Sequence, residues 1–311
     1  MTRSLIAMLA LASGFAVATT ARAEVSVEQT PLGVTVKLDG QPFTEYLIRS
    51  GSKPILWPVI GPTGKRVTRN WPMEKAVAGE TDRDHPHQRS LWFTHGNVNG
   101  VDFWVEGKGR IEHKEFVKVE GGPEATIVSR NNWVTGDGSK LICQDERTLK
   151  FGGNAEQRWI DFEIAITATT GPVVFGDTKE GSFGMRVASS MRVEAKPAGG
   201  QIINSEGKTN GLAWGKQAAW VDYHGPVEGE TAGIAILNHP SSYGFPTYWH
   251  VRTYGLFAAN PFGLHDFTNG QTKGEYTLPA GETLKLRYRV LLHKGDEKAG
   301  KVAEAFADFA K

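Results

Sequence analysis

The amino-acid sequence predicts an all-β protein, a large antiparallel β-sandwich that ends in one helix. Residues 34–38, 160–167 and 284–290 alternate apolar and polar side chains, which is the period of a strand with one wet face. Residues 125–134 and 233–237 fit the same class. Turn signals such as Asp39-Gly40 and Gly199-Gly200 separate these segments. Many strands at short spacing, with few helices, are typical of a large sandwich or barrel.

The helix is predicted at residues 296–311, behind the acidic pair Asp296 and Glu297. Its apolar stripe at helical spacing consists of Ala299, Val302, Ala303, Phe306 and Phe309. No linker, low-complexity segment or internal repeat interrupts the chain. We therefore expect a single β-sandwich domain over residues 24–311, with the helix against one edge of a sheet.

Residues 1–23 have the pattern of a secretory signal peptide. Arg3 supplies a positive start, residues 5–17 are apolar but too few to span a bilayer, and Ala21-Arg22-Ala23 is a cleavage site. No later segment approaches the roughly 18 apolar residues of a membrane helix. The sequence therefore predicts a periplasmic or secreted protein that does not insert into the membrane after cleavage.

The charge balance and the single cysteine narrow the possible partners. Cleavage would remove Arg3 and Arg22, which changes the formal charge from +1 to −1. Such a balanced chain gives no reason to expect nucleic acid as a partner. Cys143 lacks a second cysteine for an internal disulfide and lies in an apolar stretch, so we expect a buried and unreactive thiol.

The most informative segment is 84–104, which begins Asp84-His85-Pro86-His87-Gln88-Arg89 and also contains His95. Its lack of helical or strict strand periodicity predicts a loop, and polar groups gathered on loops often form a site. An extended His-x-His sequence places both rings on one face. His85 and His87 could ligate a metal, or act as acid, base and binding groups. A turn with hydrogen-bonding histidines is the alternative.

A second polar segment, 175–186, is predicted to be a glycine-rich loop and contains Asp177 and Glu180. Two carboxylates can divide acid and base roles when their environments separate their pKa values. A solvated turn with Lys179 as counterion explains Asp177 equally well. Glu180 is the stronger candidate, because Gly181 and Gly184 leave room for a close approach of backbone or ligand.

A third segment, 220–225, carries Trp220 and Asp222 on one face of a predicted strand. An indole beside a carboxylate is typical of a sugar platform, although core packing is the more common role of a single tryptophan. The fourth segment, 238–263, is rich in aromatic, basic and amide side chains on backbone broken by proline. Its candidates are His239, Tyr248, Trp249, His250, Arg252 and Asn260.

Several catalytic signatures are missing from the sequence: Gly-x-Ser-x-Gly, the P-loop, Gly-x-Gly-x-x-Gly after a strand, and His-Glu-x-x-His. Their absence disfavours α/β-hydrolase, nucleotide-binding and zincin chemistry. A tyrosine near an arginine and a histidine would also suit β-elimination of uronate sugars, which needs a base and cations that stabilise an enolate. Carbohydrate or metal chemistry on a β scaffold remains.

The four segments resemble a family of exported bacterial proteins, known as the DUF6807 or "methane oxygenase PmoA-like" family. The resemblance is carried by residues 84–92, 99–104, 177–181, 220–223, 239–240, 249–252 and 254–263. The family's pattern often has a second tryptophan where Phe93 stands. Methane oxidation is not implied, because the membrane methane monooxygenase subunit is a multi-helix membrane protein. The resemblance implies carbohydrate utilisation and a galactose mutarotase-like supersandwich, an analogy of fold.

Together these observations predict a periplasmic enzyme that acts on a sugar or oligosaccharide by hydrolysis, elimination or epimerisation. The predicted catalytic residues are His85, His87, Asp177, Glu180 and His250. The predicted substrate-binding residues are Arg89, His95, Trp220, Asp222, His239, Tyr248, Trp249, Arg252 and Asn260. His85, His87, His239 and His250 are also candidate ligands of a divalent metal. We expect these four histidines to converge on Glu180 in one concave pocket. A non-catalytic carbohydrate-binding protein and a metal-dependent oxidoreductase are the alternatives.

Overall fold

The computed structural model describes residues 23–311 except 76, 78–79, 81 and 198. The predicted signal peptide therefore lies almost entirely outside the described residues. Within the described part, no helix reaches the length and apolar character that a membrane span requires.

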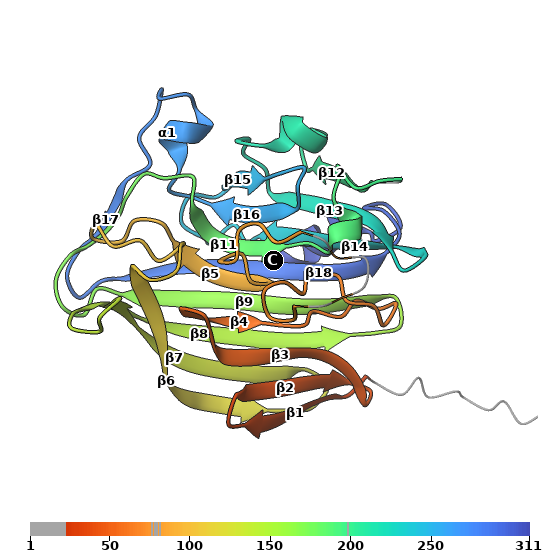
Figure 1. The fold of residues 1–311 in the computed structure, drawn as a ribbon, viewed down its shortest axis with the longest axis horizontal. Coiled ribbons are helices and arrows are strands. Elements are labelled where there is room, and N and C mark those ends of the chain that lie inside the picture. The colour runs from red at the N-terminus through yellow and green to blue at the C-terminus, as the bar shows by residue number, and fades with distance from the viewer. Residues whose placement is uncertain (1–22, 76, 78–79, 81, 198) are drawn as a thin grey trace, which may run out of the picture.

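Two large antiparallel sheets form the protein, which confirms the predicted β-sandwich (Figure 1). The first sheet has the order β1 (Val25–Thr30), β2 (Gly33–Leu38), β3 (Gln41–Ser50), β4 (Lys53–Leu56), β5 (Leu91–His95), β11 (Gly181–Arg186), β16 (Leu256–Asn260) and β15 (Tyr248–Val251). The second has the order β12 (Gln201–Asn204), β13 (Trp220–Val227), β14 (Glu230–Asn238), β18 (Thr283–Lys294), β9 (Gln157–Thr167), β8 (Leu141–Gly153), β7 (Ala125–Thr135) and β6 (Gly109–Glu120).

The remaining elements are short. β10 (Val173–Phe175) and β17 (Tyr276–Leu278) form a two-stranded sheet. Single 3-10 turns occupy Ser189–Met191 and Asn210–Ala213, and α1 spans Leu264–Phe267. The predicted C-terminal helix is present as α2 (Val302–Phe309), shorter than the expected 296–311. The residues before Val302 instead form turns, including one in which Asp296 accepts hydrogen bonds from the backbone of Lys298 and Ala299.

The main core lies between the two sheets and is rich in aromatic side chains. Phe183 on β11 stacks on Tyr288 of β18, with ring centroids 4.7 Å apart, and Phe93 on β5 stacks on Phe162 of β9 at 6.3 Å. Cys143 is also buried in this core, as predicted. Burial of this apolar surface is the main contribution that holds the sheets together.

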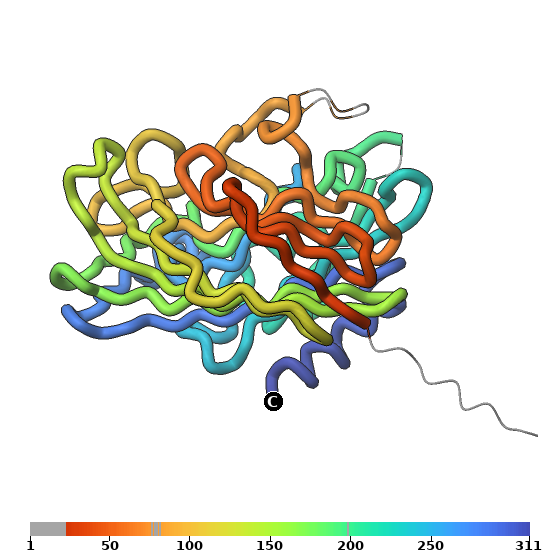
Figure 2. The backbone as a smooth tube through the Cα atoms, turned by 90° about the horizontal axis from the view of Figure 1, so that it is seen from below, coloured from red at the N-terminus to blue at the C-terminus, as the bar shows by residue number. Residues whose placement is uncertain are grey.

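Each sheet also has an outer face, and the two outer faces are covered differently. On the second sheet, α2 packs Val302 and Phe309 against Ala235, Leu237 and Leu291. On the first sheet, loops cover a smaller apolar cluster that includes Ile55, Trp92, Trp104, Leu256 and Ala258. Figure 2 shows these loops and α2 on opposite sides of the sandwich. A residue on one outer face is therefore separated from the other face by the whole core.

Candidate functional site

A row of side chains across the outer face of the first sheet positions the candidate site. Strand pairing aligns Ile55 with Trp92, Trp92 with Gly184, Gly184 with Ala258, and Ala258 with His250. Residues directly opposite one another in a sheet share a face. His250 therefore lies on the same outer face as the tryptophan-rich cluster beneath the loop that carries His85 and His87.

The carboxylate of Asp84 contacts three charged or polar side chains on this face. It accepts hydrogen bonds from Arg69 Nη1 at 2.6 Å and from Arg186 Nη2 at 2.9 and 3.0 Å. It also contacts His85 Nδ1 at 2.5 Å. Burial alone would raise the pKa of Asp84, but Arg186, the hydrogen bond to His85 and Arg69 together hold it well below its usual range. The carboxylate is thus an anion, and His85 Nδ1 is the donor.

His85 is held in one orientation by its surroundings. Its φ of +44° lies in the left-handed region, where a non-glycine residue is uncommon and such backbone often marks a functional site. Its carbonyl accepts a hydrogen bond from Arg69 Nη2 at 3.1 Å. Its ring stacks on Tyr254, with centroids 5.4 Å apart and planes 8° apart, and the side chain is 42% exposed. With Nδ1–H bound to Asp84, Nε2 is the free ring nitrogen.

His87 stands beside His85 but in a drier place. The two ring centroids are 5.7 Å apart, and the His87 ring is 6.3 Å from that of Trp104. Burial, together with the positive charge of Lys53, lowers the pKa of His87 to about 4. Lys53 is itself fully buried, with its Nζ 5.8 Å from the ring of Trp92, and burial lowers its pKa to about 7. His87 is therefore a neutral imidazole at neutral pH.

Glu180 lies on the same face, and His250 supports it from below. Burial raises the pKa of Glu180, while the charges of Lys179 and His85 act in the opposite direction. His250 Nδ1 donates to the carbonyl oxygen of Lys179 at 2.8 Å, which ties β15 to the segment that carries Glu180. Burial lowers the pKa of His250 to about 4, so its ring is neutral and positions Lys179 and Glu180 through the backbone.

We call this surface the histidine face, and its members are Asp84, His85, His87, Glu180, Arg186, Arg252 and Tyr254. It is open rather than enclosed. Glu180 is 39% exposed at its side chain, and the five cavities that we describe, the largest of about 730 Å³, are lined by other residues. The concave pocket expected around Glu180 is therefore not among them.

His239, Trp220 and Asp222 do not join the histidine face. His239 packs edge-on against Phe309 of α2, with ring centroids 5.1 Å apart, on the outer face of the second sheet. Trp220 pairs with Leu237 and belongs to the same α2 cluster. The expectation that four histidines converge is thus wrong for His239, because β14 directs it to the opposite outer face.

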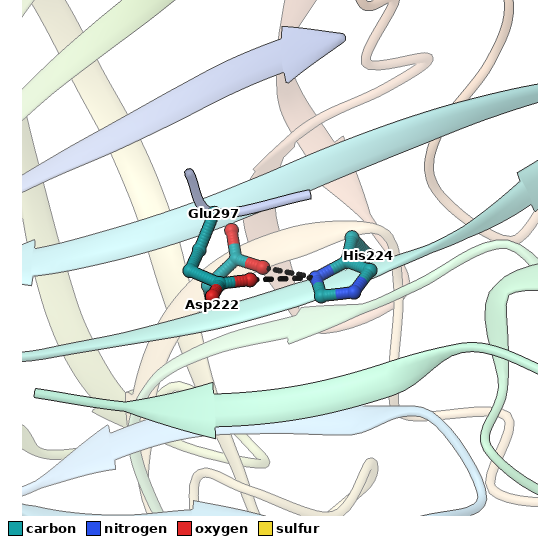
Figure 3. A group of neighbouring side chains, drawn as sticks. All are labelled: Asp222, His224 and Glu297. Carbon is teal, nitrogen blue, oxygen red and sulfur yellow. Dashed lines mark hydrogen bonds and ion pairs between the residues drawn. The ribbon is translucent and has the colours of Figure 1, made fainter. Parts of the chain in front are cut away.

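Asp222 shares its strand face with Trp220, as predicted, but serves a different cluster (Figure 3). It is fully buried, and its two oxygens accept hydrogen bonds from His224 Nδ1 at 2.6 Å and His293 Nε2 at 2.7 Å. Glu297 Oε2 lies 3.9 Å from His224 Nδ1. Although burial opposes it, the hydrogen bond and the charge of Asp222 raise the pKa of His224.

This cluster is also the place where the described residues come nearest to a metal site. Asp222, His224 and Glu297 offer ligand atoms within 4.8 Å of one another, the one such group in the described part of the chain. Two ligands bound at about 2.0–2.1 Å and at right angles or wider lie about 2.9 Å or more apart. The 2.6 Å contact of Asp222 with His224 is shorter and fits a shared proton. We interpret the cluster as a hydrogen-bonded clasp.

Three further candidates are buried in the core or bind backbone carbonyls, so they expose almost no surface that a ligand could contact. His95 donates from Nε2 to the carbonyl oxygen of Gly176 at 2.7 Å and is fully buried. Trp249 faces the main core, and its Nε1 donates to the carbonyl of Ala218 at 3.0 Å. Asn260, also fully buried, donates to the carbonyl of Thr178 at 2.9 Å. Their predicted role in substrate binding is corrected to a structural one.

The last three candidates stand at the margins. Asp177 accepts hydrogen bonds from the backbone of His265 at 3.0 Å and of Gly274 at 2.6 Å, so it anchors a loop. Tyr248 stacks on Phe267 of α1 at 5.7 Å. Arg89 pairs with Glu106 at 2.5 Å and is largely covered.

Sequence reasoning missed several residues of the histidine face and its support: Asp84, Arg69, Arg186, Lys53, Trp214 and Tyr254. Tyr254 lies in the turn between β15 and β16, with the guanidinium carbon of Arg186 4.8 Å from its ring centre. Asp84 and Tyr254 stood within the polar segments and could have been chosen on that signal. Arg69 and Lys53 carry no local signal, because only the fold brings them beneath the loop.

Comparison with known proteins places the chain in a family. A family model described as a family of unknown function (DUF6807) matches residues 33–307. The chain belongs to the DUF6807 family. No curated protein is significantly similar to it.

The solved structures that the fold resembles are distant. An α-galactosidase from Lactobacillus brevis is 10% identical with a TM-score of 0.40, over 92% of this chain and 41% of that one. A heparan sulfate lyase HepC mutant from Pedobacter heparinus is 9% identical with a TM-score of 0.35, over 89% and 36%. A β-arabinopyranosidase is 9% identical with a TM-score of 0.32, over 88% and 39%. This chain spans less than half the length of each.

Proposed function

We propose that the protein is an exported carbohydrate-active enzyme that uses acid/base chemistry on the histidine face. The observation that carries the proposal is the Asp84–His85 pair, in which an ionised carboxylate lies 2.5 Å from His85 Nδ1. A carboxylate that fixes the tautomer and orientation of an imidazole is the arrangement by which enzymes prepare a histidine as a base.

His85 is the proposed general base. Its Nε2 has no partner in the described structure and stands on a side chain that is 42% exposed, so a substrate hydroxyl or a C–H group can reach it. Arg69 and Arg186 keep Asp84 ionised, which stabilises the imidazolium that forms when His85 takes a proton. Stacking on Tyr254 restricts the ring to one plane.

Glu180 is the proposed general acid. Burial raises its pKa, which keeps the carboxyl protonated to a higher pH than usual. The charge of His85 acts on the pKa of Glu180, so the two groups are near enough to interact. A base and an acid on one face are what hydrolysis, elimination and epimerisation of sugars each require.

The remaining groups suit a sugar ligand. Pyranose rings present apolar faces and many hydroxyl groups, so their sites combine aromatic surfaces with a few polar side chains. The histidine face combines the rings of His85 and Tyr254 with the guanidinium of Arg252 and the carboxyl of Glu180. A non-catalytic carbohydrate-binding protein would use the same surfaces without needing the Asp84–His85 pair.

The decisive experiment compares His85→Gln with His239→Gln in a glycan-degradation screen of the purified protein. Wild type should turn over at least one oligosaccharide class. His85→Gln should lower that turnover by roughly 10²–10⁴-fold, because it removes the titrating ring nitrogen. His239→Gln, on the opposite outer face, should remain fully active. Full activity of His85→Gln would overturn the proposal, and sugar binding without turnover by wild type would establish the binding protein instead.

A further inference from the structure

One cation on the histidine face, Arg252, has no carboxylate partner among the described residues. Arg252 follows β15, and its side chain is exposed. Its guanidinium carbon lies 5.6 Å from the ring centre of Trp214 and 5.9 Å from that of Tyr254. Arg252 takes part in none of the ion pairs of up to 4.0 Å between described residues. The two aromatic rings therefore flank a guanidinium group that has no carboxylate partner in the described part of the chain.

The other charged groups of this face are already engaged. Asp84 is shared between two buried arginines, Arg69 and Arg186. Lys179 stands 3.8 Å from Glu180 and 3.9 Å from Asp266. With Glu180 counted as ionised, Arg252 makes four cations with these two arginines and Lys179, against the three carboxylates of Asp84, Glu180 and Asp266. The face as a whole has an excess of positive charge beside the groups proposed to be catalytic.

Neighbouring groups respond to this excess. Burial is the main reason for the low pKa of His250, and the positive charges of Arg252 and Lys179 lower it further. Tyr254 experiences Arg186 and Arg252 together, and their attraction opposes the rise in its pKa that burial causes. An anion placed against Arg252 would restore the balance that the protein's own side chains leave incomplete.

We infer that the ligand of the histidine face is an acidic sugar, with its carboxylate bound by Arg252. This inference rests on the proposed function. A guanidinium fork matches a carboxylate with two parallel N–H···O bonds, and its flat surface stays on Trp214 and Tyr254 while it does so. The sugar ring then lies toward His85 and Glu180. A neutral sugar offers Arg252 only hydroxyl groups, which are weaker acceptors.

The test uses pairs of ligands that differ in one charge. Oligogalacturonate, oligoglucuronate and oligomannuronate are each titrated calorimetrically into the purified protein. The methyl ester of each oligosaccharide is titrated in the same way. At least one uronate should bind about tenfold or more tighter than its ester. Arg252→Gln should abolish that preference. Arg252→Lys should retain only part of it, because an ammonium keeps the charge and loses the fork.

Arg289→Gln is the matched control. Its guanidinium carbon also stands over two rings, 5.9 Å from Trp159 and 4.8 Å from Phe309, but on the opposite outer face, so the preference for the uronate should persist. Equal binding of esters and uronates, or binding of no uronate, would overturn this inference. If neutral oligosaccharides were nevertheless turned over in a way that depends on His85, the proposed function would stand. Failure of every sugar and indifference to His85→Gln would remove both.

Discussion

Glu180→Gln is expected to separate an effect on catalysis from an effect on stability. The carboxyl group makes one ion pair, 3.8 Å long, with Lys179, and both side chains are about two-fifths exposed at 39% and 43%. Pairs of this kind contribute about 0.5 kcal/mol or less, which corresponds to a shift of about 1–2 °C in melting temperature. Glutamine keeps the shape of the side chain. A general acid, by contrast, contributes roughly 10²–10⁴-fold to turnover, or about 3–5 kcal/mol.

The assay is steady-state turnover of the best glycan as a function of pH, with the melting temperature of each variant. A rate that needs protonated Glu180 declines as pH rises through its raised pKa, and this decline should disappear in Glu180→Gln. Asp266→Asn is the control, since Asp266 lies 3.9 Å from the same lysine and is 38% exposed. Equal losses of turnover in both variants, or none in Glu180→Gln, would refute the assignment of Glu180 as the acid.

Four further outcomes follow from the structure. His95 and His250 are buried with pKa values of about 4, below the ordinary 6.5, so the unfolded chain binds more protons between these values and stability falls as pH falls through that window. Urea unfolding at pH 7 and 5 should show a loss of a few kcal/mol, roughly 3 per histidine over the full window, and equal stability would contradict it. Cys143 is buried and its pKa is raised well above the ordinary value, so iodoacetamide should label it only after unfolding; rapid labelling of the native protein would show otherwise. Asp222→Asn should cost roughly 3 kcal/mol, because the clasp of His224 and His293 loses its buried anion, and an unchanged urea midpoint would disprove the clasp. His239→Ala should lower stability by about 1 kcal/mol through its lost contact with Phe309 and leave turnover intact, whereas lost turnover would return His239 to the site.

The strands that could be predicted are those with one wet face. β2, β9 and β18 alternate buried and exposed residues, and the period of two in the sequence records that alternation. β5 and β11 were expected to be loops, yet each is a strand whose residues are all buried. A strand covered on both faces has no alternation, so its polar residues and glycines resemble a loop when the sequence is read alone.

The site was predictable only in part, for a similar reason. The polar density of segment 84–104 drew attention to His85 and His87, whose rings adjoin each other in the fold. The partners of that segment are distant in sequence: Arg186 is 102 residues from the carboxylate it binds. His239 is the opposite case. Its sequence neighbourhood is as polar as that of the other candidates, but β14 directs it to the outer face of the second sheet. No local pattern encodes which outer face a strand end will reach.

Gly184 has a consequence for how ligand preference could change. A Cβ at this position would come within 2.6 Å of the indole of Trp92, so glycine is what lets that indole lie against β11. Trp92 contacts Trp104 at a ring separation of 5.3 Å, and Trp104 in turn stands 6.3 Å from His87. The indoles of Trp92 and Trp104 thus link Gly184 in the sheet to the imidazole of His87. Under the proposed function, substitutions beneath the histidine face retune which sugars it accepts while every residue that touches the ligand stays the same.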